Sequence, residues 1–242
     1  MIERNTNAAR FAAVLLTAMW INSAHAAITP EQKCQAGRAK AAGRLQACVQ
    51  KEIAATFGDD LDQAALSSCR IKYANTWNKL QLLVGTTCDV ARFVDNGDGT
   101  VTDNLSALVW EKKDELDGIH NKDTTYSWTT SDGDLTDEDG TVFTDFLATL
   151  NAGEGFAGAN GWRLPTFVEL LTIVLPEPYI CVTNPCIDPI FGPTNDPYMT
   201  STTYGNLLTS EWLISFSDGS AGTGVGKSNA IYYYARAVRG GL

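Results

Sequence analysis

The sequence predicts an α+β fold in which a domain of short strands and helices follows a disulfide-linked antiparallel helical hairpin. Three observations predict it. Residues 27–88 are rich in Ala and carry helix-capping signals. From residue 89 onward, short apolar runs alternate with Gly, Asn, Asp and Thr, as in strands joined by turns and long polar loops. Four of the six cysteines lie at matched positions along the helical segment. We therefore divide the chain into residues 1–26, 27–88 and 89–242.

The N-terminus has the three parts of a cleavable signal peptide. Arg4 and Arg10 supply positive charge, residues 11–21 are apolar, and residues 22–26 are small or polar and end in Ala-His-Ala. The apolar run is shorter than the roughly 20 residues that cross a bilayer, and an N-terminal core helix is the alternative. We expect cleavage after Ala26, export to the periplasm, the cell surface or the medium, and no transmembrane segment in the mature chain.

Two helices are expected in residues 27–88. Thr29-Pro30-Glu31-Gln32 combines an N-cap Thr, a Pro at the first helical position and a capping-box Gln. This helix is expected to run to about Ala55 and to stop at Phe57-Gly58. Asp60-Leu61-Asp62-Gln63 then opens a second helix that extends to Gly85. The hairpin would serve either as a spacer or docking module, or as a brace for the domain that follows.

All six cysteines are expected to form disulfides, because an even number behind a signal peptide is typical of an oxidising compartment. A zinc site would compete, but the sequence has no CxxC pair and only one histidine after Ala26. Nested pairing follows from the hairpin geometry, and two staples would compensate for its small apolar surface. The predicted pairs are Cys34 with Cys88, Cys48 with Cys69, and Cys181 with Cys186.

Charge is distributed unevenly between the two parts of the mature chain. Residues 27–88 carry eight Lys or Arg and five Asp or Glu, a net charge of +3. Residues 89–242 carry eight basic and 22 acidic residues, a net charge of −14. A domain this acidic repels phosphates, so we expect no nucleic-acid partner. It also disfavours sulfated polysaccharide as a ligand, unless a local basic patch or calcium bridges the two.

The elements after residue 89 are predicted to be short. Residues 92–94 and 100–102 flank Asp95-Asn96-Gly97-Asp98-Gly99, which predicts a β-hairpin. Other segments are predicted from spacing and capping signals: a strand at 108–110, a helix at 143–150, a helix capped by Thr166 with Glu169, and strands at 212–216 and 231–238.

Three groups of motifs run in order through residues 90–242. The first spans residues 92–112, the second is Trp162-Arg163-Leu164-Pro165-Thr166 with Glu169-Leu170, and the third comprises residues 201–204, Trp212 and residues 236–241. Together they resemble the DUF1566 family, also called the Lcl C-terminal domain. The resemblance implies a C-type-lectin-like fold, related to the formylglycine-generating and sulfatase-modifying proteins. It identifies a fold better than an activity.

The large residues of these motifs are expected to be structural. Trp110, Trp162 and Trp212 are apolar anchors on strands or strand ends and belong in the core. Arg163 is expected to pair with a partly buried carboxylate or with carbonyl groups.

No catalytic set stands out in the sequence. Catalytic enzymes of the related fold group use cysteines with copper or a histidine cluster with iron, and neither set is present. A Ser-His-Asp triad would depend on His120, which lies in a polar loop. A carboxylate pair for glycoside hydrolysis is uninformative among 22 acidic residues. We expect no enzyme activity, with a carboxylate-based hydrolase as the remaining alternative.

Calcium is the one cofactor that the acidic loops suggest. Residues 95–99 and 134–140 are dense in oxygen ligands, but neither fits an EF-hand, because Leu105 or Phe146 would occupy the last ligand position. A plain β-turn and a solvated loop are the alternatives. The candidate ligands are Asp95, Asp98, Asp137 and Asp139.

Long polar loops are expected to gather on one side and to form the binding surface: residues 117–140, 195–210 and 217–229. Accessible aromatic side chains there would suit sugar rings or a protein hot spot. The candidates are Tyr126, Trp128, Tyr198 and Tyr204, although Trp128 and Tyr204 could instead cover the core. We expect an exported, non-catalytic module that recognises a glycan or a protein. The alternative is a structural cell-envelope component that docks through its helical hairpin.

Overall fold

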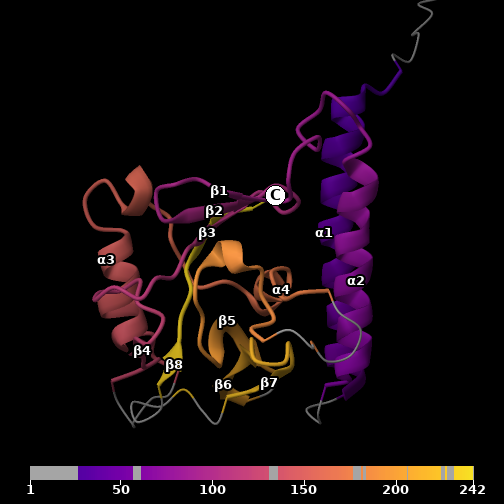
Figure 1. Cartoon of the computed structure of the whole chain (residues 1–242). Coiled ribbons are helices and arrows are strands. Elements are labelled where there is room, and N and C mark those ends of the chain that lie inside the picture. The colour runs from indigo at the N-terminus through magenta and orange to yellow at the C-terminus, as the bar shows by residue number, and fades with distance from the viewer. Residues whose placement is uncertain are drawn as a thin grey trace, which may run out of the picture.

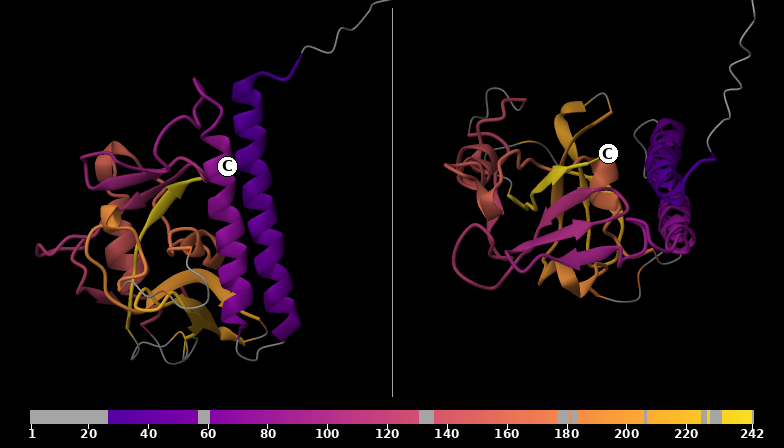
Figure 2. Two further views of the ribbon diagram at one scale, coloured as in Figure 1. Left: turned by 45° about the vertical axis from the view of Figure 1, so that its right-hand side comes forward. Right: turned by 90° about the horizontal axis from the view of Figure 1, so that it is seen from above.

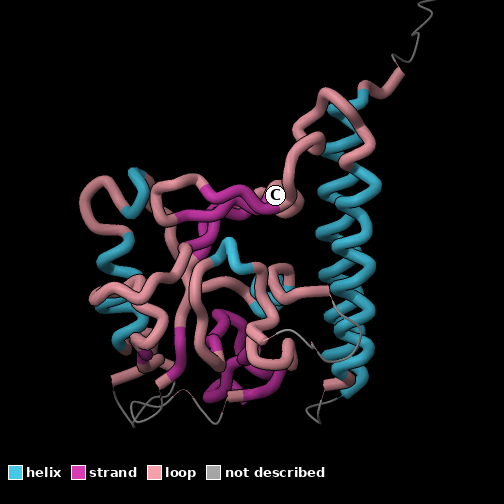
Figure 3. Tube along the Cα trace, viewed as in Figure 1, coloured by secondary structure: helices cyan, strands magenta, loops and turns pink. Residues whose placement is uncertain are grey.

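The computed structural model describes residues 27–56, 61–130, 136–176, 181, 184–205, 207–224, 227 and 232–241. The predicted signal peptide and the predicted helix stop at Phe57-Gly58 lie outside the described residues. Helices α1 (Pro30–Thr56) and α2 (Gln63–Leu80) run side by side along one edge of the molecule (Figure 1). Residues 89–241, hereafter the C-terminal part, contain the strands (Figure 3). The α+β class is therefore confirmed, and the arrangement is compatible with the C-type-lectin-like prediction.

The predicted caps begin both hairpin helices. Thr29 and Gln32 exchange hydrogen bonds of 2.9 and 3.1 Å, which completes the capping box at α1. The Asp62 carboxylate accepts the backbone N–H groups of Ala64 and Ala65 at the start of α2. Gly37 permits close packing of the helices, because a Cβ there would lie 2.3 Å from the Leu80 side chain.

Helix α2 ends earlier than the sequence suggested. It stops at Leu80, and residues 81–90 form turns instead of continuing to Gly85. The chain must turn back here because Cys88 bonds to Cys34. The Glu31 carboxylate reinforces the turn by accepting the Thr87 N–H at 2.9 Å and its hydroxyl at 2.8 Å.

All three predicted disulfides are confirmed. Cys34–Cys88 links the two helices at the open end of the hairpin, and Cys48–Cys69 links them nearer its closed end. Cys181–Cys186 closes the short loop in the C-terminal part. No cysteine of the chain is free.

Two sheets build the C-terminal part. The four-stranded sheet has the order β1-β2-β3-β9 and is antiparallel throughout. The five-stranded sheet has the order β4-β8-β5-β6-β7, and only its β5–β8 pair is parallel. The strands are β1 (Phe93–Asp95), β2 (Thr100–Asp103), β3 (Leu108–Glu111), β4 (Thr125–Tyr126), β5 (Tyr198–Tyr204), β6 (Leu207–Ile214), β7 (Ala221–Thr223), β8 (Tyr233–Tyr234) and β9 (Val238–Gly240).

The predicted β-hairpin is formed by β1 and β2, and the predicted strand at 108–110 is β3. The prediction of the last strand was wrong in one respect. Residues 231–238 were expected to be one strand, but β8 and β9 belong to different sheets. Arg236 lies between them and is fully buried, and its Nη1 donates to the carbonyls of Glu111 and Phe191. These bonds hold the chain as it crosses from one sheet to the other.

Short helices fill the remaining space. The predicted helix at 143–150 is a π-helical turn, η1 (Val142–Leu147), followed by α3 (Ala148–Leu150). The predicted capping box begins α4 (Phe167–Leu171), where Thr166 and Glu169 bond reciprocally. The 3₁₀ turns are η2 (Phe156–Gly158) and η3 (Pro189–Phe191). Among the described helices, none combines the length and the apolar character needed to cross a bilayer.

The helical hairpin is fixed against the C-terminal part, on one side of it in both views of Figure 2. Apolar side chains of both helices join one core cluster with residues of the two sheets. Three side chains add polar contacts across the boundary. Arg38 donates to the Leu105 carbonyl, Arg70 donates to the Gly219 carbonyl, and Gln63 exchanges two hydrogen bonds with the Ala221 backbone. This packing is what the brace interpretation of the hairpin predicts.

Candidate functional site

A cleft of about 480 Å³ lies between the hairpin and the C-terminal part. This volume falls within the usual range for small-ligand sites, which often lie between folding units. One wall comes from the hairpin, and the other from α4, β3 and the chain end. The lining residues are Ala42, Gly43, Leu45, Gln46 and Tyr73 on the first wall, and Ser106, Leu108, Arg163, Thr166, Val168, Glu169, Thr172, Gly240 and Gly241 on the second.

The strongest polar feature of the cleft is a bidentate ion pair between Arg163 and Glu169. Arg163 Nη1 donates to Glu169 Oε2 at 2.8 Å, and Nη2 donates to Oε1 at 2.7 Å. Burial opposes ionisation of Glu169, but the bonds from Arg163 and Thr166 outweigh it and hold the pKa of Glu169 below its ordinary value. The same bond to Glu169 raises the pKa of Arg163. The predicted carboxylate pairing of Arg163 is thus present.

Local sequence sets the position of this pair. The backbone of Arg163 exchanges two hydrogen bonds with Val238, so the motif is joined to β9. Three residues later Thr166 caps α4, and its N–H and hydroxyl both donate to Glu169 Oε2. The ion pair therefore lies where the β9 edge meets the first turn of a helix. Its side chains are 42 % and 22 % exposed, so a ligand in the cleft can reach them.

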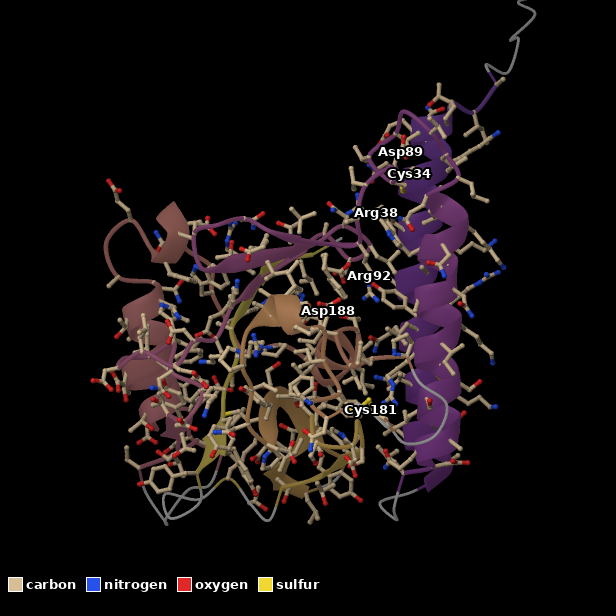
Figure 4. The ribbon with its side chains drawn as sticks, in the orientation of Figure 1. Cys34, Arg38, Asp89, Arg92, Cys181 and Asp188 are labelled. Carbon is tan, nitrogen blue, oxygen red and sulfur yellow. A yellow bond between two sulfur atoms is a disulfide. The ribbon has the colours of Figure 1, made fainter. Side chains whose placement is uncertain are left out.

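A second charge network supports the wall beneath the cleft. Arg92 and Asp103 form two hydrogen bonds of 3.1 Å, and Arg92 also donates to the Thr172 carbonyl. Asp103 accepts the Ser106 hydroxyl at 2.8 Å. The Arg92 guanidinium lies 5.2 Å from the centre of the Tyr73 ring, which links the network to α2. Figure 4 shows Arg92 on the hairpin side of the C-terminal part.

The cleft combines hydrogen-bonding groups with an apolar wall. Gln46, Thr166 and the ion pair supply donors and acceptors, while Leu45, Leu108 and Val168 supply apolar surface. Among the described residues that line the cleft, Glu169 is the only carboxylate, and none is a histidine or a cysteine. This arrangement suits recognition of a small polar ligand with an apolar face.

The four aromatic candidates for ligand contact are buried, so the expectation of accessible rings was wrong. Tyr126, Trp128, Tyr198 and Tyr204 are at most 7 % exposed. Packing is the reason: Tyr126 contacts Phe146, Tyr204 contacts Trp212, and Tyr198 contacts Phe216 and Tyr234, with ring centroids 4.8–5.8 Å apart. These rings are part of the core, as are the motif residues Trp110, Trp162 and Trp212.

The three polar loops that were expected to form the binding surface do meet. Lys227 Nζ donates to Thr203 Oγ1 at 3.0 Å and lies 4.0 Å from the centre of the Trp128 ring. Glu211 is buried nearby, and its Oε2 finds no hydrogen-bond partner within the described residues. Burial raises the pKa of Glu211 and lowers the pKa of Lys227. Residues 131–135, 206, 225–226 and 228–231 lie outside the described residues.

The four calcium candidates fall into two separate groups. Asp95 accepts the Gly97 N–H and pairs with Lys112, while Asp98 accepts the N–H and hydroxyl of Thr100. These contacts are those of a β-turn. Asp139 accepts three hydrogen bonds from Thr129 and Thr130, and Asp137 is exposed. Among the described residues, no three His, Cys, Asp or Glu side chains gather closely enough to hold a metal ion.

A buried ionic cluster was missed by sequence reasoning. Glu111 Oε1 contacts Lys113 Nζ and His120 Nδ1, both at 2.8 Å, and Glu111 Oε2 accepts the Ala237 N–H at 2.9 Å. Alternation along the strand could have indicated that Lys112 and Lys113 face opposite sides. The cluster places His120 beside a carboxylate, and its ring is tilted against that of Phe156 with centroids 4.3 Å apart.

Comparison with curated proteins and with solved structures gives no match. Comparison with protein families gives one, over residues 99–239. This segment contains the Arg163–Glu169 pair and both sheets except β1 and the end of β9. It covers more than half of the sequence, and its motifs occupy the structural positions just described. The chain belongs to the Lcl C-terminal domain family.

Proposed function

We propose that the chain is an exported, non-catalytic binding module that holds a short glycan segment in the cleft between hairpin and C-terminal part. The observation that carries the proposal is the partly exposed Arg163–Glu169 pair within a 480 Å³ cleft. Sugar hydroxyls require donors and acceptors side by side, and a planar bidentate pair supplies both. The C–H face of a sugar ring requires apolar surface, which Leu108 and Val168 supply.

A binding role is favoured over hydrolysis by the composition of the cleft. Glycoside hydrolysis requires two carboxyl groups flanking the scissile bond. Within the part of the chain that the structure describes, no second carboxylate lines the cleft opposite Glu169, and the oxygens of Glu169 are engaged by Arg163 and Thr166. A structural role through the hairpin is the second candidate. The exposed apolar side chains Leu82 and Val84, beyond the end of α2, favour it.

Export is supported by the signal-peptide pattern and by the pairing of all six cysteines. Mass spectrometry of the native protein tests it. We expect an N-terminus at Ala27, whereas a retained Met1 would contradict export by cleavage.

Blocking the cleft tests the binding site. Gly43 lies in α1, lines the cleft, and has no heavy atom within 4 Å of a Cβ built there. A Cβ at position 43 therefore meets no neighbour, so Gly43→Leu should project into the cleft and should stabilise α1, since Gly costs about 1 kcal/mol in a helix interior. On a glycan array, run with and without calcium, we expect the wild type to bind and Gly43→Leu to lose that binding.

Ala39→Leu is the matched control, because Ala39 is an exposed α1 residue that does not line the cleft. It should bind as the wild type does. Equal binding by Gly43→Leu would remove the cleft as the site. A wild type that captures no glycan in either buffer would leave the structural role ahead.

A further inference from the structure

The hairpin carries a second groove, of about 490 Å³, that lies between α1 and α2. Every lining residue belongs to the hairpin, and two of them, Leu45 and Tyr73, also line the cleft. Three of them are basic: Arg44 on α1, and Lys72 and Lys79 on α2. None of the described residues that line the groove is an Asp or a Glu. Such a site has cationic walls and no internal counter-charge.

The three cations are available for a ligand. Arg44, Lys72 and Lys79 are all exposed. In the described part of the chain, their side chains form no ion pair; the hairpin's single ion pair there is Lys51–Glu52. Lys72 and Lys79 are seven residues apart, which is two turns along one face of α2. Arg44 faces them from the neighbouring helix, so the charges surround the groove from both sides.

The floor of the groove is rigid. It comprises Ala41, Leu45, the Cys48–Cys69 disulfide and Tyr73, which belong to or pack against the shared core. A fixed floor holds the cations in place before a ligand arrives, which reduces the entropy lost on binding. Arg44 can accommodate two oxygens of one phosphate, and the lysines act as mobile point charges.

We propose that this groove binds the phosphate groups of anionic phospholipid headgroups and so docks the hairpin on a membrane surface. The proposal concerns a different site from the cleft and does not rest on it. Figure 4 shows nitrogen-bearing side chains along the side of the hairpin that faces away from the C-terminal part. An anionic surface is the complement of this face.

The acidic C-terminal part does not prevent such docking. The C-terminal part, which carries most of the acidic residues of the sequence, lies to one side of the hairpin (Figure 2). A helix is about 10 Å wide with its side chains, and the Debye length is about 8 Å at physiological ionic strength. The repulsion is therefore largely screened at a surface that touches the hairpin. The charge asymmetry would instead orient the molecule, with the C-terminal part away from the membrane.

A lipid source is favoured over free phosphate by the apolar end of the hairpin. Leu82 and Val84 follow Lys79 closely in the chain and are 77 % and 78 % exposed. Exposed apolar side chains next to cations are typical of segments that enter the interface of an anionic bilayer. A soluble phosphate would leave these side chains in water.

Vesicle co-sedimentation tests the proposal with the purified chain, disulfides intact. We expect binding to vesicles of equal parts phosphatidylcholine and phosphatidylglycerol, and none to phosphatidylcholine alone. Each cation near such a surface contributes roughly fivefold, so Arg44→Gln/Lys72→Gln/Lys79→Gln should lower the partition coefficient roughly a hundredfold. Leu82→Ser/Val84→Ser should also weaken vesicle binding. Circular dichroism would verify that each variant is folded.

The matched control is Lys33→Gln/Lys40→Gln/Lys51→Gln, which removes the same charge from the hairpin outside the groove. It should bind at least tenfold more strongly than the groove variant. Equal losses in the two variants, or equal binding to both kinds of vesicle, would overturn the groove as the site. Inorganic phosphate is the second probe. Tight binding of phosphate in the groove, with an unaltered affinity in Leu82→Ser/Val84→Ser, would overturn the lipid source.

Discussion

Glu111→Gln should be among the most destabilising isosteric changes available in this protein. Glu111 is fully buried and contacts Lys113, His120 and the Ala237 N–H. Burial opposes its ionisation, but Lys113 and His120 outweigh that effect and hold the pKa of Glu111 below its ordinary value. The side chain thus carries a negative charge that the surrounding cations require. Gln keeps the shape and removes the charge.

The size of the expected loss in stability follows from the buried cation that Glu111→Gln leaves without its carboxylate. The Lys113 side chain is 2 % exposed, so its ammonium group would lose its carboxylate without gaining water. Arg236, also fully buried, adds repulsion between cations. Breaking a buried ion pair by removing one partner typically costs about 3–5 kcal/mol. We expect a loss of this size in the free energy of unfolding. Glu111→Gln/Lys113→Met should recover much of it, because the stranded cation is then absent.

The adjacent lysine supplies the control. Lys112 pairs with Asp95 at the surface, where the two side chains are 34 % and 37 % exposed. Exposed ion pairs contribute about 0–1 kcal/mol, so Asp95→Asn and Lys112→Met should each cost less than about 1 kcal/mol. Urea denaturation followed by circular dichroism measures all four variants. Similar small losses for Glu111→Gln and Asp95→Asn would refute the assignment of a charged, buried Glu111.

Three further predictions concern stability. Removing the Cys34–Cys88 bond, which closes a span of 54 residues, should lower the free energy of unfolding by about 4 kcal/mol. Removing Cys181–Cys186, which closes a span of 5 residues, should lower it by about 2 kcal/mol. Urea denaturation of the double Ala variants measures both losses. Trp128→Ala and Tyr204→Ala should each cost about 3–5 kcal/mol, because both rings are buried; changes below about 1 kcal/mol would contradict a core role. The pKa of Glu169 is lowered in the folded state, so its contribution to the free energy of unfolding is present above its ordinary pKa of 4.5 and is lost as pH falls through the folded-state value. Glu169→Gln should therefore make the free energy of unfolding depend less on pH at the acid end of the profile. An unchanged acid limb would contradict the ion pair.

Local signals were the part of the fold that sequence could predict. The capping boxes at Thr29 and Thr166 each involve a residue three positions away, so no tertiary information is needed. The nested disulfides followed from the antiparallel hairpin, which constrains pairing geometrically. Helix α2 was overextended because its end is set by a distant contact, the bond between Cys88 and Cys34.

Burial of the aromatic side chains could not be predicted from loop composition. Trp128 lies in a polar segment that indicates exposure, yet Lys227, Phe143 and the rest of the core enclose it. The enclosing residues come from segments up to about a hundred positions away. Composition reports the average environment of a loop, whereas burial is decided by such individual long-range contacts.

The cleft has two walls, and the family match covers the wall from the C-terminal part but not the wall from the hairpin. Arg163, Thr166 and Glu169 lie within residues 99–239, whereas Gly43 and Gln46 lie in the hairpin. The family's motif can therefore position the ion pair, but the hairpin residues set the width and the polarity of the cleft in front of that pair. If the cleft binds a ligand, selectivity between ligands should depend mainly on residues 42–46. Gln46→Ala should accordingly change which ligands are preferred, while Glu169→Gln should weaken all of them.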